Sequence, residues 1–303
     1  MTKVNMSVDL NGLKLHNPIT VASGTFGFGR EYADFIDLND IGAISVKGLT
    51  LKKKKGNPSP RLAETPMGII NSVGLQNPGV DVFIKEEIPF LRQFKTKIIA
   101  NANGNSVEEY IEIVEILSDA DVDSIELNIS CPNVKEGGMA FGTNPEMVKK
   151  VVSQVRKVCK KHLIVKLSPN VTNIGEIAKI VEAEGADAVS LINTLTGMAI
   201  DIHTFKPIIA NRIGGVSGPA VKPVALKMVH DVSRSVKIPV LGMGGISNSE
   251  DAAEFLLAGA TAVAVGTANF KNPYVCKEVL DGLHTYMKEK KFTCIEDIQK
   301  AFR

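Results

Sequence analysis

Short apolar runs recur along this chain of 303 residues, and each is followed by a stretch in which apolar residues return at helical spacing. The runs are continuous rather than alternating, which is typical of parallel strands that are covered on both faces of a sheet. The predicted strands are Ile19–Ala22, Ala43–Lys47, Ile98–Asn101, Ser124–Ile129, Leu163–Leu167, Ala188–Asn193, Pro239–Met243 and Ala262–Val265. The predicted helices are Arg30–Asp37, Val80–Phe94, Val107–Ser118, Pro145–Lys161, Ile174–Glu184, Pro223–Ser235, Ser249–Ala258 and Pro273–Lys288. This repeated order of strand and helix predicts an α/β fold of the TIM (β/α)8 barrel class, and we expect residues 1–303 to form a single domain.

The segment Met6–His16 precedes the first predicted strand and alternates apolar and polar residues around Asn11-Gly12. That dipeptide favours a type I′ turn, so we expect an N-terminal β-hairpin that closes one end of the fold, with a plain loop as the alternative. Two connections are unusually long, residues 48–79 after the second strand and residues 194–222 after the sixth. Long loops in compact domains are usually functional or disordered, and we expect these two to form walls or lids of a substrate site.

Composition excludes several classes of function. The formal net charge is only +2, and the chain has no Trp and four Tyr, so we expect no nucleic-acid or membrane surface. The N-terminal residues lack the apolar run of a signal peptide, and no apolar stretch approaches the roughly 20 residues of a membrane span. No cysteines are spaced as CxxC and no histidines have metal-ligand spacing, so we expect a cytoplasmic protein without a metal site.

Polar residues and glycines follow the predicted strands where each strand ends. They are Ser23, Lys47 with Gly48, Asn101 with Asn103, Asn128, Lys166, Asn193 with Thr194, Gly244 with Gly245, and Gly266 with Thr267. In a parallel barrel the carboxyl ends of the strands share one rim, and active sites lie there. A repeated change from apolar to polar residues in register is hard to explain by packing, so we expect a functional site at this rim.

A thiol follows the fourth predicted strand. Cys131 is followed by Pro132, which cannot donate to a sheet ladder, so the strand must end there. The thiol is then either a reactive group at the rim or a buried cysteine that fills space, which is how most free cysteines behave.

The other rim residues have distinct chemical uses. Glycines after the last two strands let backbone N–H groups approach a phosphate, near a helix that is expected to begin at Ser249. Lys166 pointing inward would suit the anionic edge of a reduced flavin, and Lys47 would suit a carboxylate, whereas a surface lysine is the alternative for each. The amides of Asn71, Asn128 and Asn193 would suit a ring that carries both C=O and N–H groups, such as a pyrimidine, although each could be a turn residue. The run Lys52–Lys55 is expected to be a solvated loop tip, with a docking patch for an acidic partner as the alternative.

Long strings of the sequence resemble the dihydroorotate dehydrogenase family, specifically the FMN-carrying catalytic subunit of its NAD-linked bacterial type. The strings are NPITVASGTFGFGREY, SVKGLT, GNPSPR, ETPMGIINSVGLQNPGV, IELNISCPNVKEGG, IVKLSPNV, LINT, GGVSGPAVKP, LGMGGISNSEDA and VGTANFKNP. The resemblance implies oxidation of (S)-dihydroorotate to orotate in pyrimidine biosynthesis. Cys131 would be the general base at C5 of the substrate, and hydride would pass from C6 to the flavin. A free thiol has a pKa of about 8.5, so it can act as a base without a histidine partner.

The resemblance also implies roles for individual residues. The residues implied to bind the substrate are Lys47, Asn71, Ser72, Val73, Gly74, Leu75, Asn128, Asn193 and Thr194. The residues implied to hold FMN are Ser23, Lys47, Gly48, Asn101, Asn128, Lys166, Ile192, Gly218, Gly244, Gly245, Gly266 and Thr267. Asn101 and Asn103 both remain candidates for the flavin contact at the third strand.

The resemblance implies a second subunit as well. In the NAD-linked type, a partner that carries FAD and an iron–sulfur cluster passes electrons to NAD, and two copies of each chain form a heterotetramer around a homodimer of the catalytic subunit. This chain has neither a Cys₄ pattern nor a dinucleotide fingerprint, so both groups are expected on the partner. The alternatives are a fumarate-linked homodimer and a non-catalytic flavin-binding or scaffold barrel.

Overall fold

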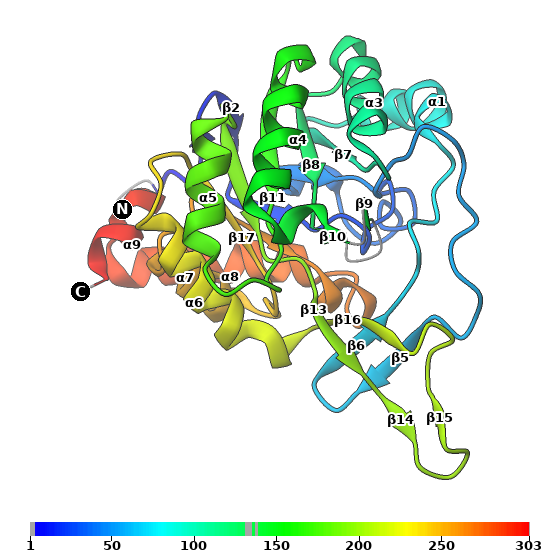
Figure 1. The fold of residues 1–303 in the computed structure, drawn as a ribbon. Coiled ribbons are helices and arrows are strands. Elements are labelled where there is room, and N and C mark those ends of the chain that lie inside the picture. The colour runs from blue at the N-terminus through cyan, green and yellow to red at the C-terminus, as the bar shows by residue number, and fades with distance from the viewer. Residues whose placement is uncertain (1–3, 131–134, 137–138, 303) are drawn as a thin grey trace.

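The computed structural model describes residues 4–130, 135–136 and 139–302. Within them, eight parallel strands close into a barrel in which each strand pairs with the next barrel strand along the chain (Figure 1). The strands are β3 (Ile19–Val21), β4 (Ala43–Ser45), β7 (Lys97–Ala102), β8 (Ser124–Asn128), β11 (His162–Lys166), β12 (Ala188–Leu191), β17 (Val240–Met243) and β18 (Ala262–Val265). The predicted TIM barrel is confirmed.

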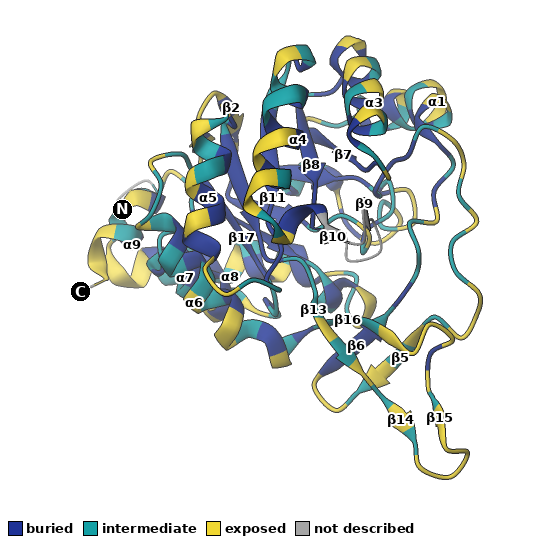
Figure 2. Cartoon of the chain, in the orientation of Figure 1, coloured by how far each residue is buried: buried dark blue, intermediate teal, exposed yellow. Residues whose placement is uncertain are grey.

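Amphipathic helices cover the outside of the barrel. They are α3 (Val107–Asp119), α4 (Pro145–Val158), α5 (Ile174–Ala183), α6 (Lys222–Ser233), α7 (Ser249–Leu257) and α8 (Val275–Lys290). Four of them begin at a side chain that accepts a hydrogen bond from a backbone N–H of the first turn, namely Ser106, Asn144, Asn173 and Asn248. Figure 2 shows the barrel strands buried at the centre and the outer helix faces exposed, which is the layering of a barrel enzyme.

The predicted helix over residues 80–94 is interrupted. Its turns are α1 (Val80–Val82), the π-helical η2 (Phe83–Glu87) and α2 (Ile88–Leu91). Pro89 lies in the first turn of α2 and has no N–H to donate to the carbonyl four residues earlier. In the π turn before it, the Ile88 N–H donates to the Phe83 carbonyl five residues earlier, so the backbone tolerates the N–H that Pro89 lacks.

The prediction of a helix over residues 30–37 is wrong. The segment forms successive turns and is followed by the short 3₁₀ helix η1 (Leu38–Asp40). Tyr32 stacks on Phe26 with ring centroids 3.9 Å apart, and its hydroxyl donates to the Thr25 carbonyl at 3.0 Å. These contacts hold the segment against the preceding loop, and such tertiary packing overrides the weak helical periodicity.

The two long connections form one antiparallel sheet rather than separate loops. β5 (Leu62–Thr65) and β6 (Gly68–Asn71) come from the first connection, and β13 (Leu195–Met198) and β16 (Ile213–Ser217) come from the second. The order is β13-β16-β6-β5, so β16 and β6 join the two connections. A short arm, β14 (Ile200–Asp201) with β15 (Lys206–Pro207), projects beyond this sheet (Figure 1).

The remaining elements close the ends. β1 (Val8–Leu10) pairs with β2 (Leu13–Leu15) across Asn11 and Gly12, whose φ angles are 59° and 104°. Asn11 Nδ2 donates to the Asp187 carbonyl, one residue before β12, so the pair lies at the amino-terminal end of the barrel. The C-terminal helix α9 (Ile295–Ala301), which we did not predict, begins with a capping box between Cys294 and Asp297. The short elements are β9 (Lys135–Glu136), β10 (Met139–Ala140), η3 (Phe141–Thr143), η4 (Pro219–Val221) and η5 (Thr267–Phe270).

Candidate active site

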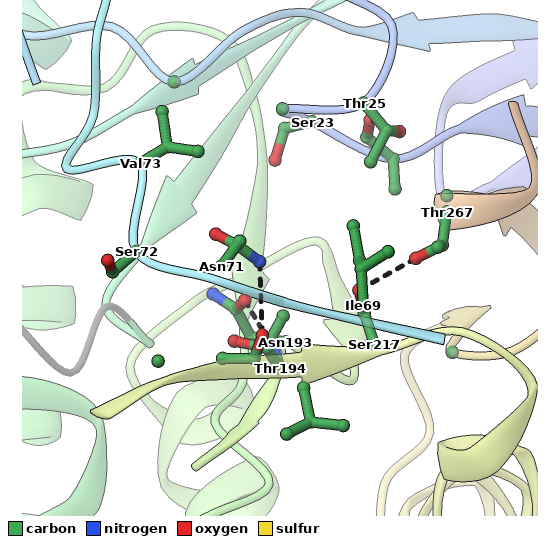
Figure 3. A pocket seen from close by; sticks show the side chains of 18 of the residues that line it. Ser23, Thr25, Ile69, Asn71, Ser72, Val73, Asn193, Thr194, Ser217 and Thr267 are labelled. Carbon is green, nitrogen blue, oxygen red and sulfur yellow. Dashed lines mark hydrogen bonds between the residues drawn. The ribbon is translucent and has the colours of Figure 1, made fainter. Parts of the chain in front are cut away.

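A cavity of about 540 Å³ opens at the carboxyl ends of the barrel strands, beneath the antiparallel sheet. Every barrel strand or the residues just after it contribute to the lining, which is the location predicted from the polar strand ends. Figure 3 shows part of this lining, with Ser23 and Thr25 from the β3 end and Asn71 from β6. Apart from Asn103, all the described residues that the sequence assigned to the site line this cavity: Ser23, Lys47, Gly48, Asn71, Ser72, Val73, Gly74, Leu75, Asn101, Asn128, Lys166, Ile192, Asn193, Thr194, Gly218, Gly244, Gly245, Gly266 and Thr267.

Cys131 lies outside the described residues. The described chain before it ends at Ser130, which is buried and bonded to two residues of the lining. Ser130 Oγ donates to Asn128 Oδ1 at 2.7 Å and accepts from Asn193 Nδ2 at 2.5 Å. The polypeptide therefore reaches the cavity wall immediately before position 131.

Buried amides form a connected group on this wall. Asn128 Nδ2 donates to Asn101 Oδ1 at 3.3 Å, and Asn103 Nδ2 donates to the same oxygen at 2.8 Å. Asn101 lines the cavity, whereas Asn103 is not part of the lining, which favours Asn101 as the ligand contact. On the sheet side, Asn71 Nδ2 donates to the Gly215 carbonyl at 3.3 Å (Figure 3). These amides supply both donors and acceptors to one cavity.

Two lysines bring positive charge to the cavity. Lys166 is only 4% exposed, and its Nζ donates to Ser23 Oγ at 3.3 Å. Burial lowers the pKa of Lys47, and the nearby Arg61 charge lowers it further. No described carboxylate forms an ion pair with either ammonium. Because a buried ammonium is costly without a partner, the cavity is suited to anionic groups at both points.

Glycines form the wall near the ends of β17 and β18. Gly245 has a φ of 88°, and a Cβ there would lie 2.9 Å from the Lys222 nitrogen, so the fold itself requires this glycine. Gly266 differs, because a Cβ there would meet nothing nearer than the Ala22 Cβ at 3.6 Å. Space at Gly266 that the protein leaves open is consistent with the close approach of a bound group. The predicted start of α7 at Ser249 is present, but the lining on that side includes Gly245 and no residue of α7.

Sequence reasoning missed several residues of the site. Ser217, Thr196, Asn211 and Phe270 also line the cavity, and Thr267 Oγ1 donates to Ser217 Oγ at 2.8 Å (Figure 3). Most of them lie in the second long connection, where no spacing marked individual positions. Beneath the lining, the fully buried Glu126 was also overlooked, although a carboxylate inside an otherwise apolar strand is an available signal.

Comparison with known proteins identifies the family. Residues 5–287 match the profile described as dihydroorotate dehydrogenase. The chain belongs to the dihydroorotate dehydrogenase family. It is 60% identical over 299 residues to "Dihydroorotate dehydrogenase B (NAD(+)), catalytic subunit" of Alkaliphilus metalliredigens, covering 99% of each chain. Proteins with the same name from Thermoanaerobacter sp. and Geotalea uraniireducens are 57% and 54% identical, each with at least 97% of both chains covered. The family predicted from the sequence strings is thus confirmed.

Among the described residues, no helix combines the length and apolar character needed to cross a bilayer. Nor do their His, Cys, Asp and Glu side chains form a group of three or more that would hold a metal ion.

Proposed function

We propose that this chain oxidises (S)-dihydroorotate to orotate in pyrimidine biosynthesis, as the catalytic subunit of an NAD-linked dihydroorotate dehydrogenase. One observation carries the proposal. Every described residue that the family resemblance assigned to cofactor or substrate lines the same cavity, at the end of the barrel where catalytic sites lie. The near full-length similarity to catalytic subunits of the B type supports the NAD-linked form over the fumarate-linked form.

The cavity fits FMN on two grounds. Lys166 is a buried cation without an acidic partner among the described residues, and Gly266 leaves room that a side chain would otherwise fill. We assign Lys166 to the anionic edge of the flavin, and Gly218, Gly244, Gly245, Gly266 and Thr267 to its phosphate. The remaining FMN contacts are assigned to Ser23, Lys47, Gly48, Asn101, Asn128 and Ile192. When bound, FMN supplies the hydride acceptor that no amino-acid side chain provides.

The substrate is assigned to the side of the cavity nearest β6 and β13. Lys47 would neutralise the substrate carboxylate, and Asn71, Asn128 and Asn193 would pair with the ring amides, together with residues 72–75 and Thr194. Bonds to a polar ring give specificity, because buried amides left unpaired by a wrong substrate cost binding energy. The protein's part is therefore to orient C6 of the substrate and to exclude water.

Cys131 is proposed as the general base that takes the proton from C5. Its thiolate is a stronger base near neutral pH than neutral hydroxyls and needs no histidine. The proton leaves C5 for the sulfur while the hydride leaves C6, which creates the C5–C6 double bond of orotate. Because position 131 lies outside the described residues, this role depends on the resemblance and on the position of Ser130.

The electrons are proposed to leave through a partner. The name "catalytic subunit" in the relatives implies a separate electron-transfer subunit, and we propose that it carries FAD and an iron–sulfur cluster and reduces NAD. Two copies of this chain would form a homodimer within a heterotetramer. The cytoplasmic location predicted from the sequence stays a prediction.

Anaerobic flavin reduction tests the proposal directly. Purified protein loaded with FMN should lose its flavin absorbance on addition of dihydroorotate, and the co-expressed complex should reduce NAD but not depend on fumarate. Failure to bind FMN, or a flavin that stays oxidised, would refute the assignment, and the second result would favour a scaffold barrel. A fumarate-dependent turnover without a partner would instead identify the homodimeric type.

The base is tested in the same assay. Cys131→Ala should keep FMN bound but slow flavin reduction by about 100-fold or more, the usual contribution of a general base. Cys294→Ser is the matched control, because it removes a thiol that does not line the cavity and leaves a good N-cap for α9. Equal reduction rates in the two variants would remove Cys131 from the base role.

A further inference from the structure

The barrel interior below the cavity contains polar side chains where branched apolar residues are usual. Ser45, Asn101, Glu126 and Ser190 are each at most 1% exposed. Glu126, in the middle of β8, is the charged member of this group, and it does not line the cavity. A buried carboxylate is costly unless hydrogen bonds satisfy it, so its contacts decide what it can do here.

Glu126 makes two short hydrogen bonds across the barrel. Oε2 accepts from Asn101 Nδ2 at 2.5 Å, and Oε1 accepts from Ser190 Oγ at 2.6 Å. No described cation pairs with this carboxylate. Its contacts are therefore neutral donors, one of which, Asn101, also belongs to the cavity wall.

The bond to Asn101 determines which way a chain of amides points. A carboxylate can only accept, so Asn101 must turn its nitrogen toward Glu126 and its oxygen away. That oxygen accepts from Asn128 Nδ2 at 3.3 Å and from Asn103 Nδ2 at 2.8 Å. Asn128 is then left with its oxygen toward Ser130, which donates to it at 2.7 Å. The two ends of an amide have the same shape, so hydrogen bonding alone selects between the two orientations.

The neighbouring Asn103 is held with its nitrogen toward Asn101, although its own oxygen is left unsatisfied within the described chain. Asn103 Oδ1 is buried and has no hydrogen-bond partner among the described residues. An unsatisfied buried acceptor costs stability. Turning the amide would not recover that cost, because the amide oxygen would then face two acceptors, the Asn101 carbonyl and Asn101 Oδ1. The orientation of Asn103 therefore agrees with an Asn101 oxygen that points away from Glu126.

We propose that Glu126 is a positioning residue that fixes the amide orientation of Asn101 and Asn128 and so presets the hydrogen-bonding pattern offered to the pyrimidine ring. This inference rests on the proposed function, because it takes orotate as the ligand read by Asn128. Glu126 does not touch the ligand. It acts through Asn101 and Asn128, and its effect on the substrate side is read as orotate affinity in protein saturated with FMN.

The test measures orotate affinity in FMN-loaded protein from the change in flavin absorption. Glu126→Met keeps the length of the side chain but removes the acceptor, and we expect the orotate Kd to rise about 3- to 10-fold when both proteins are saturated with FMN. Glu126→Gln keeps an acceptor and should restore most of the affinity. Ser190→Ala is the matched control, since it removes the other hydrogen bond of Glu126 and leaves the one to Asn101, and its Kd should stay within about twofold of wild type.

Three results would overturn the inference. They are a wild-type Kd in Glu126→Met, an equal loss of affinity in Ser190→Ala, and a Glu126→Gln protein as weak as Glu126→Met. Neutron diffraction of the wild-type protein with orotate tests the same point even if Glu126→Met does not fold. Deuterium must be found on the Asn101 atom that faces Glu126 and on the Asn128 atom that faces Asn101, and the reverse placement would refute the proposal. Wild-type protein that binds neither FMN nor orotate would instead refute the proposed function.

Discussion

Replacing Lys166 by Met should make the apoprotein more stable than wild-type apoprotein. It should make the FMN-loaded protein less stable than FMN-loaded wild type. The Lys166 ammonium is 4% exposed. Within the described part of the chain it donates one hydrogen bond, to Ser23 at 3.3 Å, and has no carboxylate partner. One neutral hydrogen bond returns about 1 kcal/mol, whereas burial of an unpaired charge costs several. Water in the open cavity reduces that cost, so we expect a net gain of about 1 kcal/mol in the apoprotein, or roughly 1.5 °C in Tm for a chain of this length.

With FMN the sign reverses. Loss of a charge-assisted bond of about 1.5–3 kcal/mol would raise the Kd for FMN by about 10- to 150-fold. At an FMN concentration of about 100 times the wild-type Kd, ligand binding stabilises wild type by about 2.7 kcal/mol, and the variant by only about 0.3–1.4 kcal/mol. Thermal unfolding with and without FMN measures both effects in one experiment.

A second lysine provides a control of opposite sign. Lys222 Nζ lies 2.6 Å from Asp251 and 3.0 Å from Glu254, so Lys222→Met leaves carboxylates unpaired. This variant should lower the stability of the apoprotein. If Lys166→Met also destabilised the apoprotein and bound FMN as tightly as wild type, Lys166 would be a structural residue and the reasoning would fail.

Two other perturbations test the cavity wall. The Kd for orotate should rise with pH as Lys47 loses its proton, and the rise should begin below the ordinary lysine value of 10.5 because the pKa of Lys47 is lowered by burial. Lys47→Gln should bind orotate weakly without that rise, and an alkaline limb that persists in this variant would assign it to another group. Gly266→Ala should leave the Tm of the apoprotein within about 1 °C of wild type but weaken FMN binding. Gly245→Ala should itself cost about 1–2 kcal/mol, or roughly 1.5–3 °C in Tm, because its φ of 88° is strained for alanine. Equal losses of apoprotein stability in the two glycine variants would contradict the distinction.

The barrel and its rim were predictable because their signals are local. A buried parallel strand appears as a continuous apolar run, and the residue after it lies at the rim whatever the rest of the chain does. The turns over residues 30–36 were not predictable in this way, because the stacking of Tyr32 on Phe26 decides them. Helix α9 was missed because its capping pair, Cys294 with Asp297, is an unusual form of a familiar motif.

The sheet over the cavity and the carboxylate beneath it were hidden for different reasons. Asn71 and Gly215 are 144 positions apart, and no periodicity in either long connection indicates that they meet. Glu126 was overlooked in the buried strand, and only the contacts to Asn101 and Ser190 distinguish it from a misplaced surface residue. The sequence strings placed Cys131 in a family, but its geometry lies outside the described residues.

The union of the two long connections constrains how the cavity can open. β6 and β16 exchange backbone hydrogen bonds along Ile69–Asn71 and Gly215–Ser217, so neither insertion can swing away while the other stays in place. Any opening of the cavity on this side must therefore move both insertions together as one rigid unit, about a hinge where they leave the barrel. An engineer who transplants or shortens one insertion to change substrate preference must therefore redesign the other with it.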